Sequence, residues 1–339
     1  MPVKAKKWIL AHHFDGVPKD SDLELVEEEL PELQDGEILL EAQALSVDPY
    51  MRVFARSALK EGDTIMGSQV GKVIESKSPQ HPVGMMLVGS VGWRTHAIVN
   101  VNQGPDLLGT PIVVPATPAP GLPVSVNLGV LGMPGATAYF GLLELCQPKA
   151  GEVVVVSAAA GAVGSLVGQI AKIKGCTVIG YAGTDEKCKW IKEELGFDHA
   201  INYKTRDVAE SLKEAAPDGV DCYFDNVGGD FLYTVMRQMN KYGRISVCGA
   251  ISQYNDNLDN QKSGVFPGIL LIVNELRMEG FISTRWLSRW PEAFKEMAAW
   301  MKEGKLKYRE TTTKGFENMR EAFYGMLRGD NTGKAVVNV

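Results

Sequence analysis

Two patterns of hydrophobic and polar positions follow each other along the chain. Up to about residue 105, short segments alternate apolar and polar residues between Gly, Pro and Asp turns, as in 37–42, 67–75, 84–90 and 96–99. Alternation with a period of two is typical of strands that bury one face. The first part of the chain is therefore predicted to form an irregular β domain.

Beyond Gly151 the apolar positions form continuous runs of strand length, each followed by a segment of helical length. Continuous apolar runs are typical of parallel strands covered on both faces, and their alternation with helices indicates βαβ units. Gly175, Gly196 and Gly219 follow the helical segments as stop signals. The pattern predicts six parallel strands at 153–156, 177–182, 199–203, 220–224, 244–248 and 278–283.

The last part of the chain returns to the β pattern. Residues 291–302 and 318–327 predict helices, and residues 334–337 predict a final strand. Between the two patterns, residues 107–143 carry no charge, but repeated Pro and Gly would break a membrane helix, so we expect buried connecting structure. We expect two interleaved domains, one from 1–122 and 298–339 and the other from 123–297.

Composition narrows the function classes. The 339 residues are 45% hydrophobic and 22% charged, which is typical of globular proteins and argues against disorder and coiled coil. The net charge of −6 offers no bulk attraction to nucleic acid or to an anionic membrane. We therefore expect neither a nucleic-acid nor a membrane partner.

The five cysteines and five histidines are dispersed and form no metal-ligand motif, so we expect no metal site and reduced thiols. The basic N-terminus lacks the apolar core of a signal peptide. These features predict a cytoplasmic protein.

One motif carries chemistry. Residues 153–164 read as a strand that runs into an A-x-G-x-x-G turn, with Ala159, Gly161 and Gly164 at the motif positions and a helix behind them. Small residues allow the backbone to approach a pyrophosphate, and the free N–H groups and dipole of the helix favour an anion. The motif predicts a dinucleotide cofactor.

The end of the second strand bears on the choice between NAD and NADP. Asp185 has the spacing expected of a residue that binds the ribose 2′-hydroxyl, but it follows Thr184, which is a plausible helix N-cap. Lys187 lies one turn into the helix and could meet a 2′-phosphate. The residues favour NADP(H) and leave NAD open.

Several longer strings carry a resemblance. They are residues 47–52 (VDPYMR), 132–139 (GMPGATAY), 225–229 (DNVGG), 248–254 (CGAISQY) and 275–279 (ELRME). With the strand-turn-helix of 153–168, the chain resembles, over nearly its whole length, the zinc-independent branch of the medium-chain dehydrogenase/reductase superfamily. The resemblance implies an α/β fold: a Rossmann-type doubly wound parallel sheet that binds NADP(H), plus a GroES-like, mostly β catalytic domain.

The resemblance also implies an activity. It is the NADPH-dependent reduction of the carbon–carbon double bond of α,β-unsaturated ketones and aldehydes, including 15-oxoprostaglandins and lipid-derived alkenals. Hydride goes to the β-carbon, and the enolate is stabilised without a metal. Reverse oxidation of a leukotriene 12-hydroxyl lies within the family's chemistry. Two alternatives stay open: an NADPH quinone reductase of the same superfamily, and a protein that binds NADPH without catalysis.

Site residues follow from the same resemblance. Tyr254 is expected nearest the reacting carbonyl and the ribose hydroxyl, and Tyr50 is the second catalytic candidate, as part of the substrate pocket. The residues expected to bind the cofactor are Ala162, Val163, Gly164 and Ser165 at the pyrophosphate, Lys187 and Tyr203 at the 2′-phosphate, and Asn226, Cys248, Gly249, Ala250, Ile251, Ser252, Gln253, Tyr254, Phe281, Ile282, Ser283 and Asn331 elsewhere.

The chain departs from the family pattern in two places. Ser68 replaces a Gln, and a polar loop at 255–264 replaces a proline-rich loop beside the substrate pocket, which weakens any transfer of eicosanoid specificity. The sheet edge predicts a homodimer through the strand 281–283, with a monomer as the alternative.

Overall fold

The computed structural model describes residues 3–256 and 267–339 of the chain. The chain divides into two compact units: unit 1 comprises Met1–Gly132 and Glu310–Val339, and unit 2 comprises Met133–Arg309. The domain boundaries expected at 122/123 and 297/298 stay predictions. Most of the polar loop at 255–264 lies outside the described residues.

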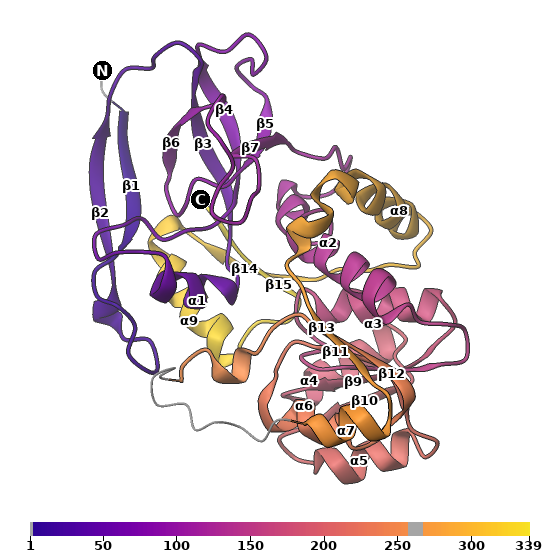
Figure 1. Ribbon diagram of the computed structural model, residues 1–339. Helices are drawn as coiled ribbons and strands as arrows, with labels where there is room; N and C mark the ends of the chain where they lie inside the picture. Colours follow the sequence, from indigo (N-terminus) through magenta and orange to yellow (C-terminus); the bar gives the residue numbers. More distant parts are fainter. Residues whose placement is uncertain (1–2, 257–266) are drawn as a thin grey trace. The chain divides into compact units, whose positions relative to one another are not determined.

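Unit 2 contains a six-stranded sheet in the order β10-β9-β8-β11-β12-β13, in which every neighbouring pair is parallel (Figure 1). The strands are β8 (Val153–Val156), β9 (Thr177–Ala182), β10 (His199–Asn202), β11 (Val220–Asp225), β12 (Met239–Val247) and β13 (Arg277–Gly280). The six predicted strands and the doubly wound α/β class are confirmed. The predicted bounds of the last strand are wrong: β13 ends at Gly280, so residues 281–283 follow it.

Helices cover both faces of this sheet. The helices of unit 2 are α2 (Met133–Phe140), α3 (Gly164–Ile173), α4 (Asp185–Lys189), α5 (Val208–Ala215), α6 (Gly229–Met236), α7 (Gly268–Val273) and α8 (Trp290–Lys302). Leu212 of α5, Val235 of α6 and Leu270 of α7 join the apolar core on one face. Helix α3 and the π-helical segment Gly141–Cys146 cover the other face. Gly175 and Gly196, two of the predicted stop signals, have φ values of 82° and 76°, which glycine adopts readily.

Unit 1 is mostly β structure. Its seven-stranded sheet has the order β14-β15-β3-β4-β5-β7, β6 pairs with β3 outside this path, and β1 and β2 form a separate antiparallel pair. The strands are β1 (Val3–Leu10), β2 (Leu23–Leu30), β3 (Glu37–Ser46), β4 (Gln69–Ser76), β5 (Met86–Gly89), β6 (His96–Asn100), β7 (Val113–Pro115), β14 (Glu310–Lys314) and β15 (Lys334–Asn338), and the helices are α1 (Tyr50–Ser57) and α9 (Met319–Arg328). The C-terminal strand β15 lies between β14 and β3, so both ends of the chain build this unit.

A buried ion pair ties β15 to the residues before α1. Lys334 is only 4% exposed, and its Nζ lies 3.0 Å from Oδ1 of buried Asp48. Nζ also donates to the carbonyls of Val47 at 2.7 Å and Ala335 at 2.8 Å, and the Ser46 hydroxyl donates to Asp48. Burial lowers the pKa of Lys334, and Asp48 opposes that shift. The pair thus fixes the backbone immediately before Tyr50.

The uncharged stretch 107–143 is only partly buried. Leu107 and Leu122 are exposed, whereas residues from Ser125 to Leu128 are buried and lead into α2. Within 3–256 and 267–339, no helix is both long and apolar enough to cross a membrane.

Candidate active site

The A-x-G-x-x-G turn connects β8 to α3 as predicted. Ala158 adopts a left-handed conformation with φ of 48°, and the Gly161 N–H donates to its carbonyl at 3.0 Å. A Cβ atom at Gly164 would lie 2.5 Å from the same carbonyl oxygen, which is too close for any side chain. Only glycine fits at the first residue of α3, where N–H groups and the helix dipole favour an anion. Ala162, Val163 and Ser165 complete this turn.

The end of β9 is tied to the start of α4 and to the end of β10. The Thr184 side chain caps α4 by accepting from the Lys187 N–H at 3.2 Å, as expected of an N-cap. The Asp185 carboxylate accepts from the side-chain amide of Asn202 at 2.7 Å. Asp185 therefore joins the start of α4 to the end of β10.

Two predicted cofactor residues, Lys187 and Tyr203, lie near the connection between β9 and α4. Tyr203 follows β10 and is 45% exposed, and its hydroxyl would lie 3.2 Å from a Cβ atom at Gly183. Lys187 is half-buried on α4, one turn from the capped end. Lys204 also approaches Gly183 through its side chain and adds a second cation that the sequence predictions did not include. Tyr203 and Lys204 thus meet at Gly183, two residues before the start of the helix that carries Lys187.

The segment after β11 is hydrogen-bonded to the end of β8. The Asn226 side-chain amide donates to the Ser157 carbonyl at 2.8 Å, and the Asn226 N–H donates to the Ser157 hydroxyl at 2.9 Å. The predicted cofactor residue Asn226 therefore lies beside the A-x-G-x-x-G turn.

The segment 248–254 follows β12 and packs on the residues after β11. The N–H groups of Cys248 and Gly249 donate to the Asp225 carbonyl at 2.8 and 3.1 Å, and the Ser252 hydroxyl donates to the Val227 carbonyl at 2.6 Å. Ile251 and Gln253 belong to its short helical turn. These predicted cofactor residues lie at the carboxyl edge of the sheet with the turn and Asn226.

Tyr254 ends this segment with its hydroxyl folded back. The hydroxyl accepts from the Ala250 N–H at 3.3 Å, and it would lie 2.9 Å from a Cβ atom at Gly249. Burial raises the pKa of Tyr254, and the Ala250 hydrogen bond opposes that rise. The Tyr254 oxygen is the acceptor in this hydrogen bond, so the bond does not use the hydroxyl proton.

Residues 281–283 follow β13. The Phe281 ring packs against Phe224, with centroids 6.3 Å apart, and against Trp286 at 5.6 Å. Ile282 is exposed and Ser283 is buried. Phe281 therefore contributes to an aromatic cluster, and the cofactor role predicted for 281–283 stays a prediction.

Two predicted site residues, Tyr50 and Asn331, belong to unit 1. Tyr50 begins α1, where burial and the charges of Asp48 and Asp106 raise its pKa well above the ordinary value. The side chain of Asn331 donates to the Gly333 carbonyl at 2.7 Å.

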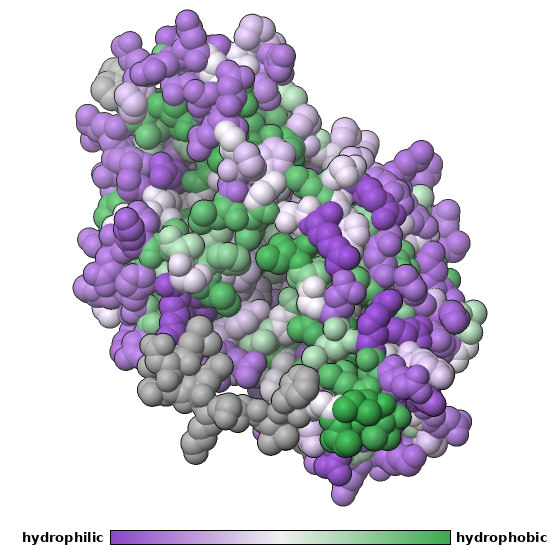
Figure 2. All heavy atoms as spheres, viewed as in Figure 1, coloured by the Kyte–Doolittle hydropathy of each residue, from purple (hydrophilic) through white to green (hydrophobic). Residues whose placement is uncertain are grey.

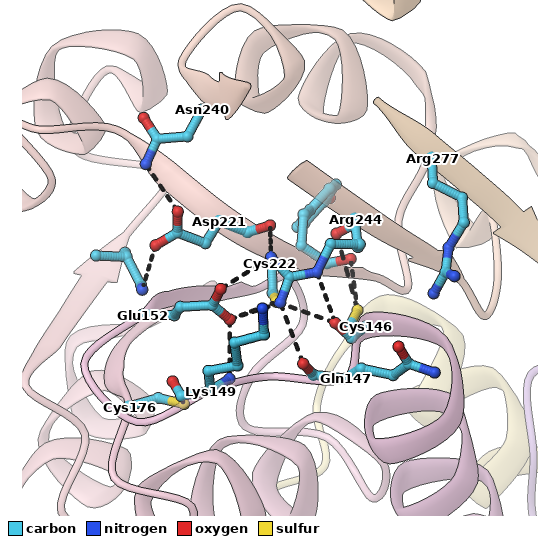
Figure 3. A network of polar contacts seen from close by, with 12 residues as sticks. Cys146, Gln147, Lys149, Glu152, Cys176, Asp221, Cys222, Asn240, Arg244 and Arg277 are labelled. Carbon is cyan, nitrogen blue, oxygen red and sulfur yellow. Dashed lines mark hydrogen bonds and ion pairs between the residues drawn. The ribbon is translucent and has the colours of Figure 1, made fainter. Parts of the chain in front are cut away.

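The opposite, amino edge of the sheet carries a different polar network (Figure 3). Arg244 donates from Nη2 to Glu152 at 2.5 Å and from Nε to the Cys146 carbonyl at 2.8 Å. Asp221, near the start of β11, accepts from the Val153 N–H at 2.8 Å and from Asn240 at 2.9 Å. Among the described residues, no group of three or more His, Cys, Asp or Glu side chains could hold a metal ion.

Comparisons with known proteins agree with this architecture. The family profile described as "N-terminal domain of oxidoreductase" matches residues 6–106, and the profile described as "Zinc-binding dehydrogenase" matches residues 162–303. Prostaglandin reductase 1 of Oryctolagus cuniculus is 54% identical over 98% of this chain and 93% of its own length. The 2-alkenal reductase (NADP(+)-dependent) of Nicotiana tabacum is 40% identical over 99% of this chain and 98% of its own.

A solved structure extends the likeness to the fold. CurA from Vibrio vulnificus in complex with NADPH has a TM-score of 0.90 and 38% sequence identity, and the match covers 98% of this chain and 99% of that chain. The parallel sheet and its glycine-rich turn are typical of a dinucleotide-binding domain, and the two profiles identify the class as an oxidoreductase. The chain belongs to the medium-chain dehydrogenase/reductase family, in the zinc-independent branch that includes prostaglandin reductase 1.

The Arg244–Glu152 pair predicts a pH dependence of stability. Burial alone would raise the pKa of Glu152, but the hydrogen bonds from Arg244 and the Lys149 N–H outweigh it, so the pKa lies below its ordinary 4.5. A lowered folded-state pKa stabilises the fold above pH 4.5 and loses that effect as the pH falls through the folded-state value. Glu152→Gln should therefore cost about 2 kcal/mol at neutral pH, measured by urea unfolding.

The cost of Glu152→Gln should shrink as the pH is lowered below 4.5. The control is Glu193→Gln, because Glu193 forms an exposed pair with Lys189 at 4.0 Å. That substitution should cost less than about 0.5 kcal/mol at any pH. A Glu152→Gln cost that stays constant down to acidic pH would contradict the assigned pKa direction.

Proposed function

We propose that this chain reduces the carbon–carbon double bond of α,β-unsaturated ketones and aldehydes with NADPH, and that 15-oxoprostaglandins and lipid-derived alkenals are its substrates. The observation that carries the proposal is the grouping of the A-x-G-x-x-G turn, Lys187, Tyr203 and Tyr254 on one edge of one sheet, in a chain 54% identical to a prostaglandin reductase 1. At the level of the family, the chain is an NADP(H)-dependent double-bond reductase. The substrates are the proposed part.

The residues at the end of β9 fit NADP(H) better than NAD. Asp185, the candidate for a ribose 2′-hydroxyl, already accepts a hydrogen bond from Asn202. We assign Lys187 and Tyr203 to the 2′-phosphate and the turn 162–165 to the pyrophosphate, because the Gly164 position leaves room only for backbone. When bound, NADPH supplies the hydride.

Tyr254 is the proposed proton donor to the oxygen that becomes negative when hydride reaches the β-carbon. Its hydroxyl is held by the Ala250 N–H, and its raised pKa keeps it protonated at neutral pH. A positioned neutral donor stabilises developing enolate charge. Tyr50, whose pKa burial raises well above the ordinary value, is proposed to contact the substrate. Oxidation of a leukotriene 12-hydroxyl would use hydride transfer in the opposite sense and is measured as NADP⁺ reduction.

The activity itself is tested by following NADPH oxidation with a 15-oxoprostaglandin, a medium-chain 2-alkenal and a quinone as separate acceptors. We expect turnover of the first two acceptors, faster with NADPH than with NADH. Turnover of the quinone alone would identify a quinone reductase and overturn the proposal. Stabilisation by NADPH without turnover of any acceptor would identify a non-catalytic NADPH-binding protein.

The cofactor assignment predicts a selective effect of Lys187→Ala. Loss of one charge-assisted hydrogen bond to the 2′-phosphate should raise the KM for NADPH about tenfold and leave the KM for NADH unchanged. The matched control is Lys189→Ala, which removes an exposed lysine of the same helix. Equal effects of Lys187→Ala on both cofactors would contradict a 2′-phosphate contact.

We also propose that the chain forms a homodimer through the sheet edge at β13 and the following residues 281–283. Edge strands pair readily with a second copy. On the adjacent helix α7, Ile269, Ile272 and Val273 are 65%, 73% and 63% exposed, and Figure 2 shows this apolar surface in green.

The dispersed cysteines, none of them in a disulfide within the described residues, support a reducing, cytoplasmic setting.

The dimer is tested by light scattering, which should give twice the mass of one chain. Ile272→Asp should lower the mass to that of a single chain because it places a charge in the apolar surface. Val17→Asp is the control, since Val17 is equally exposed in unit 1. A monomeric mass for the unmodified protein would refute the dimer.

A further inference from the structure

Asp225 is a buried carboxylate that none of the proposed catalytic steps uses. It is the last residue of β11, and its side chain is fully buried. One oxygen, Oδ1, accepts from the Tyr223 hydroxyl at 2.6 Å and from the N–H groups of Val227 and Gly228 at 2.9 and 3.0 Å. The Ser157 hydroxyl donates to the same oxygen at 3.2 Å. A single carboxylate oxygen thus joins two segments, the turn that begins at Ser157 after β8 and the residues before α6.

The backbone of Asp225 adds a third segment. Its carbonyl accepts from the N–H groups of Cys248 and Gly249, which begin the segment 248–254. Ser157 in turn accepts from the Asn226 N–H, so the side-chain and backbone contacts form one connected network. Every segment of the network carries residues assigned above to the cofactor.

We propose that Asp225 is a positioning residue of the cofactor site. It holds the A-x-G-x-x-G turn, residues 226–229 and the segment 248–254 in the single arrangement that binds the dinucleotide. This inference rests on the proposed NADPH-dependent function. Asp225 acts through these three segments.

Two properties of the carboxylate support a specific role. Burying a charge is costly unless donors compensate it, and four donors converge on Oδ1. Among the described residues, Oδ2 is buried with no hydrogen-bond partner. The charge also reaches the neighbouring segment: burial and Asp225 together raise the pKa of the Cys248 thiol to about 12. Asp225 therefore influences the neighbouring segments in two ways, through the hydrogen bonds to its carboxylate and through its negative charge.

The chain offers a matched control on the same strand. Asp221 lies near the other end of β11 and likewise accepts from a backbone N–H, of Val153, and from a side chain, of Asn240 (Figure 3). It joins neighbouring strands at the amino edge of the sheet. A merely structural carboxylate on β11 should behave like Asp221.

The test compares Asp225→Ala with Asp221→Ala by fluorescence titration of NADPH. Displacing the binding segments by a fraction of an ångström should weaken NADPH binding by about thirtyfold in Asp225→Ala, against less than about twofold in Asp221→Ala. Asp225→Asn keeps an oxygen for the four donors and should restore affinity to within about threefold of the unmodified protein. NADPH affinity equal to that of the unmodified protein in Asp225→Ala, or equal losses in both alanine variants, would overturn the inference.

A milder variant covers the case in which Asp225→Ala does not fold. Ser157→Ala removes one donor to Asp225 and the acceptor of the Asn226 N–H, and it should weaken NADPH binding about threefold. An unchanged affinity in a folded Ser157→Ala protein would count against the network.

A cofactor-free measurement separates this inference from the proposed function. In Asp225→Ala, amide hydrogen exchange should become faster at 226–229 and 248–250 without NADPH present, whereas Asp221→Ala should affect the start of β8. If the unmodified protein does not bind NADPH, the proposed function fails while the exchange data still test Asp225. Unchanged exchange at these segments would refute the positioning role. The charge is tested separately by Asp225→Asn, which should speed alkylation of Cys248 at neutral pH.

Discussion

The candidate site depends on one constraint, the alignment of four loops along the carboxyl edge of a single parallel sheet. The strands bring the loops to that edge, but strands alone do not fix how loops of different length lie against one another. In this chain, hydrogen bonds to Asp225 fix the relative positions of three of these four loops. The fourth, at the end of β9, is held by the contact between Asp185 and Asn202. Asp225 and Asp185 both serve as hydrogen-bond acceptors within the protein.

Unit 1 uses the same kind of interaction at Asp48. Its carboxylate is buried beside Lys334, whose three donated contacts join the C-terminal strand to the backbone before Tyr50. A buried pair of this kind gives little net stability but is costly to break on one side only. The last strand of the chain therefore helps to position Tyr50, a candidate substrate residue that lies almost 300 positions earlier in the sequence.

The parts of the fold that sequence predicted well are those with an unambiguous physical signature. The four consecutive valines at 153–156 favour a strand buried on both faces, because β-branched residues fit strands best. Gly164 lies where any Cβ would collide with the Ala158 carbonyl. The last strand was predicted to extend to residue 283, beyond the end of β13 at Gly280, because Phe281 is as apolar as a strand residue. In the structure the Phe281 ring packs against Phe224. Likewise, an uncharged stretch does not reveal which residues become covered, so Leu107 was expected inside and lies outside.

Sequence reasoning missed Asp225 and Ser157 for a related reason. An Asp followed by Asn, Val and two glycines is indistinguishable from an ordinary turn, and a lone serine after a strand carries no signal. Their importance comes from contacts between segments about 70 residues apart, such as that between the Ser157 hydroxyl and Asp225. Tyr50 and Tyr254 became candidate site residues only through the family resemblance, because an isolated tyrosine is more often a packing residue.

The placement of the thiols has a chemical consequence for an enzyme of conjugated carbonyl compounds, which are electrophiles that alkylate cysteine. Cys146, Cys176, Cys188 and Cys222 are buried, and Cys248 is partly so. Burial raises the pKa of Cys176 to about 11 and of Cys248 to about 12, so these two thiols form almost no reactive thiolate at neutral pH. Low thiolate content slows the alkylation of these two cysteines by the compounds that the chain is proposed to turn over.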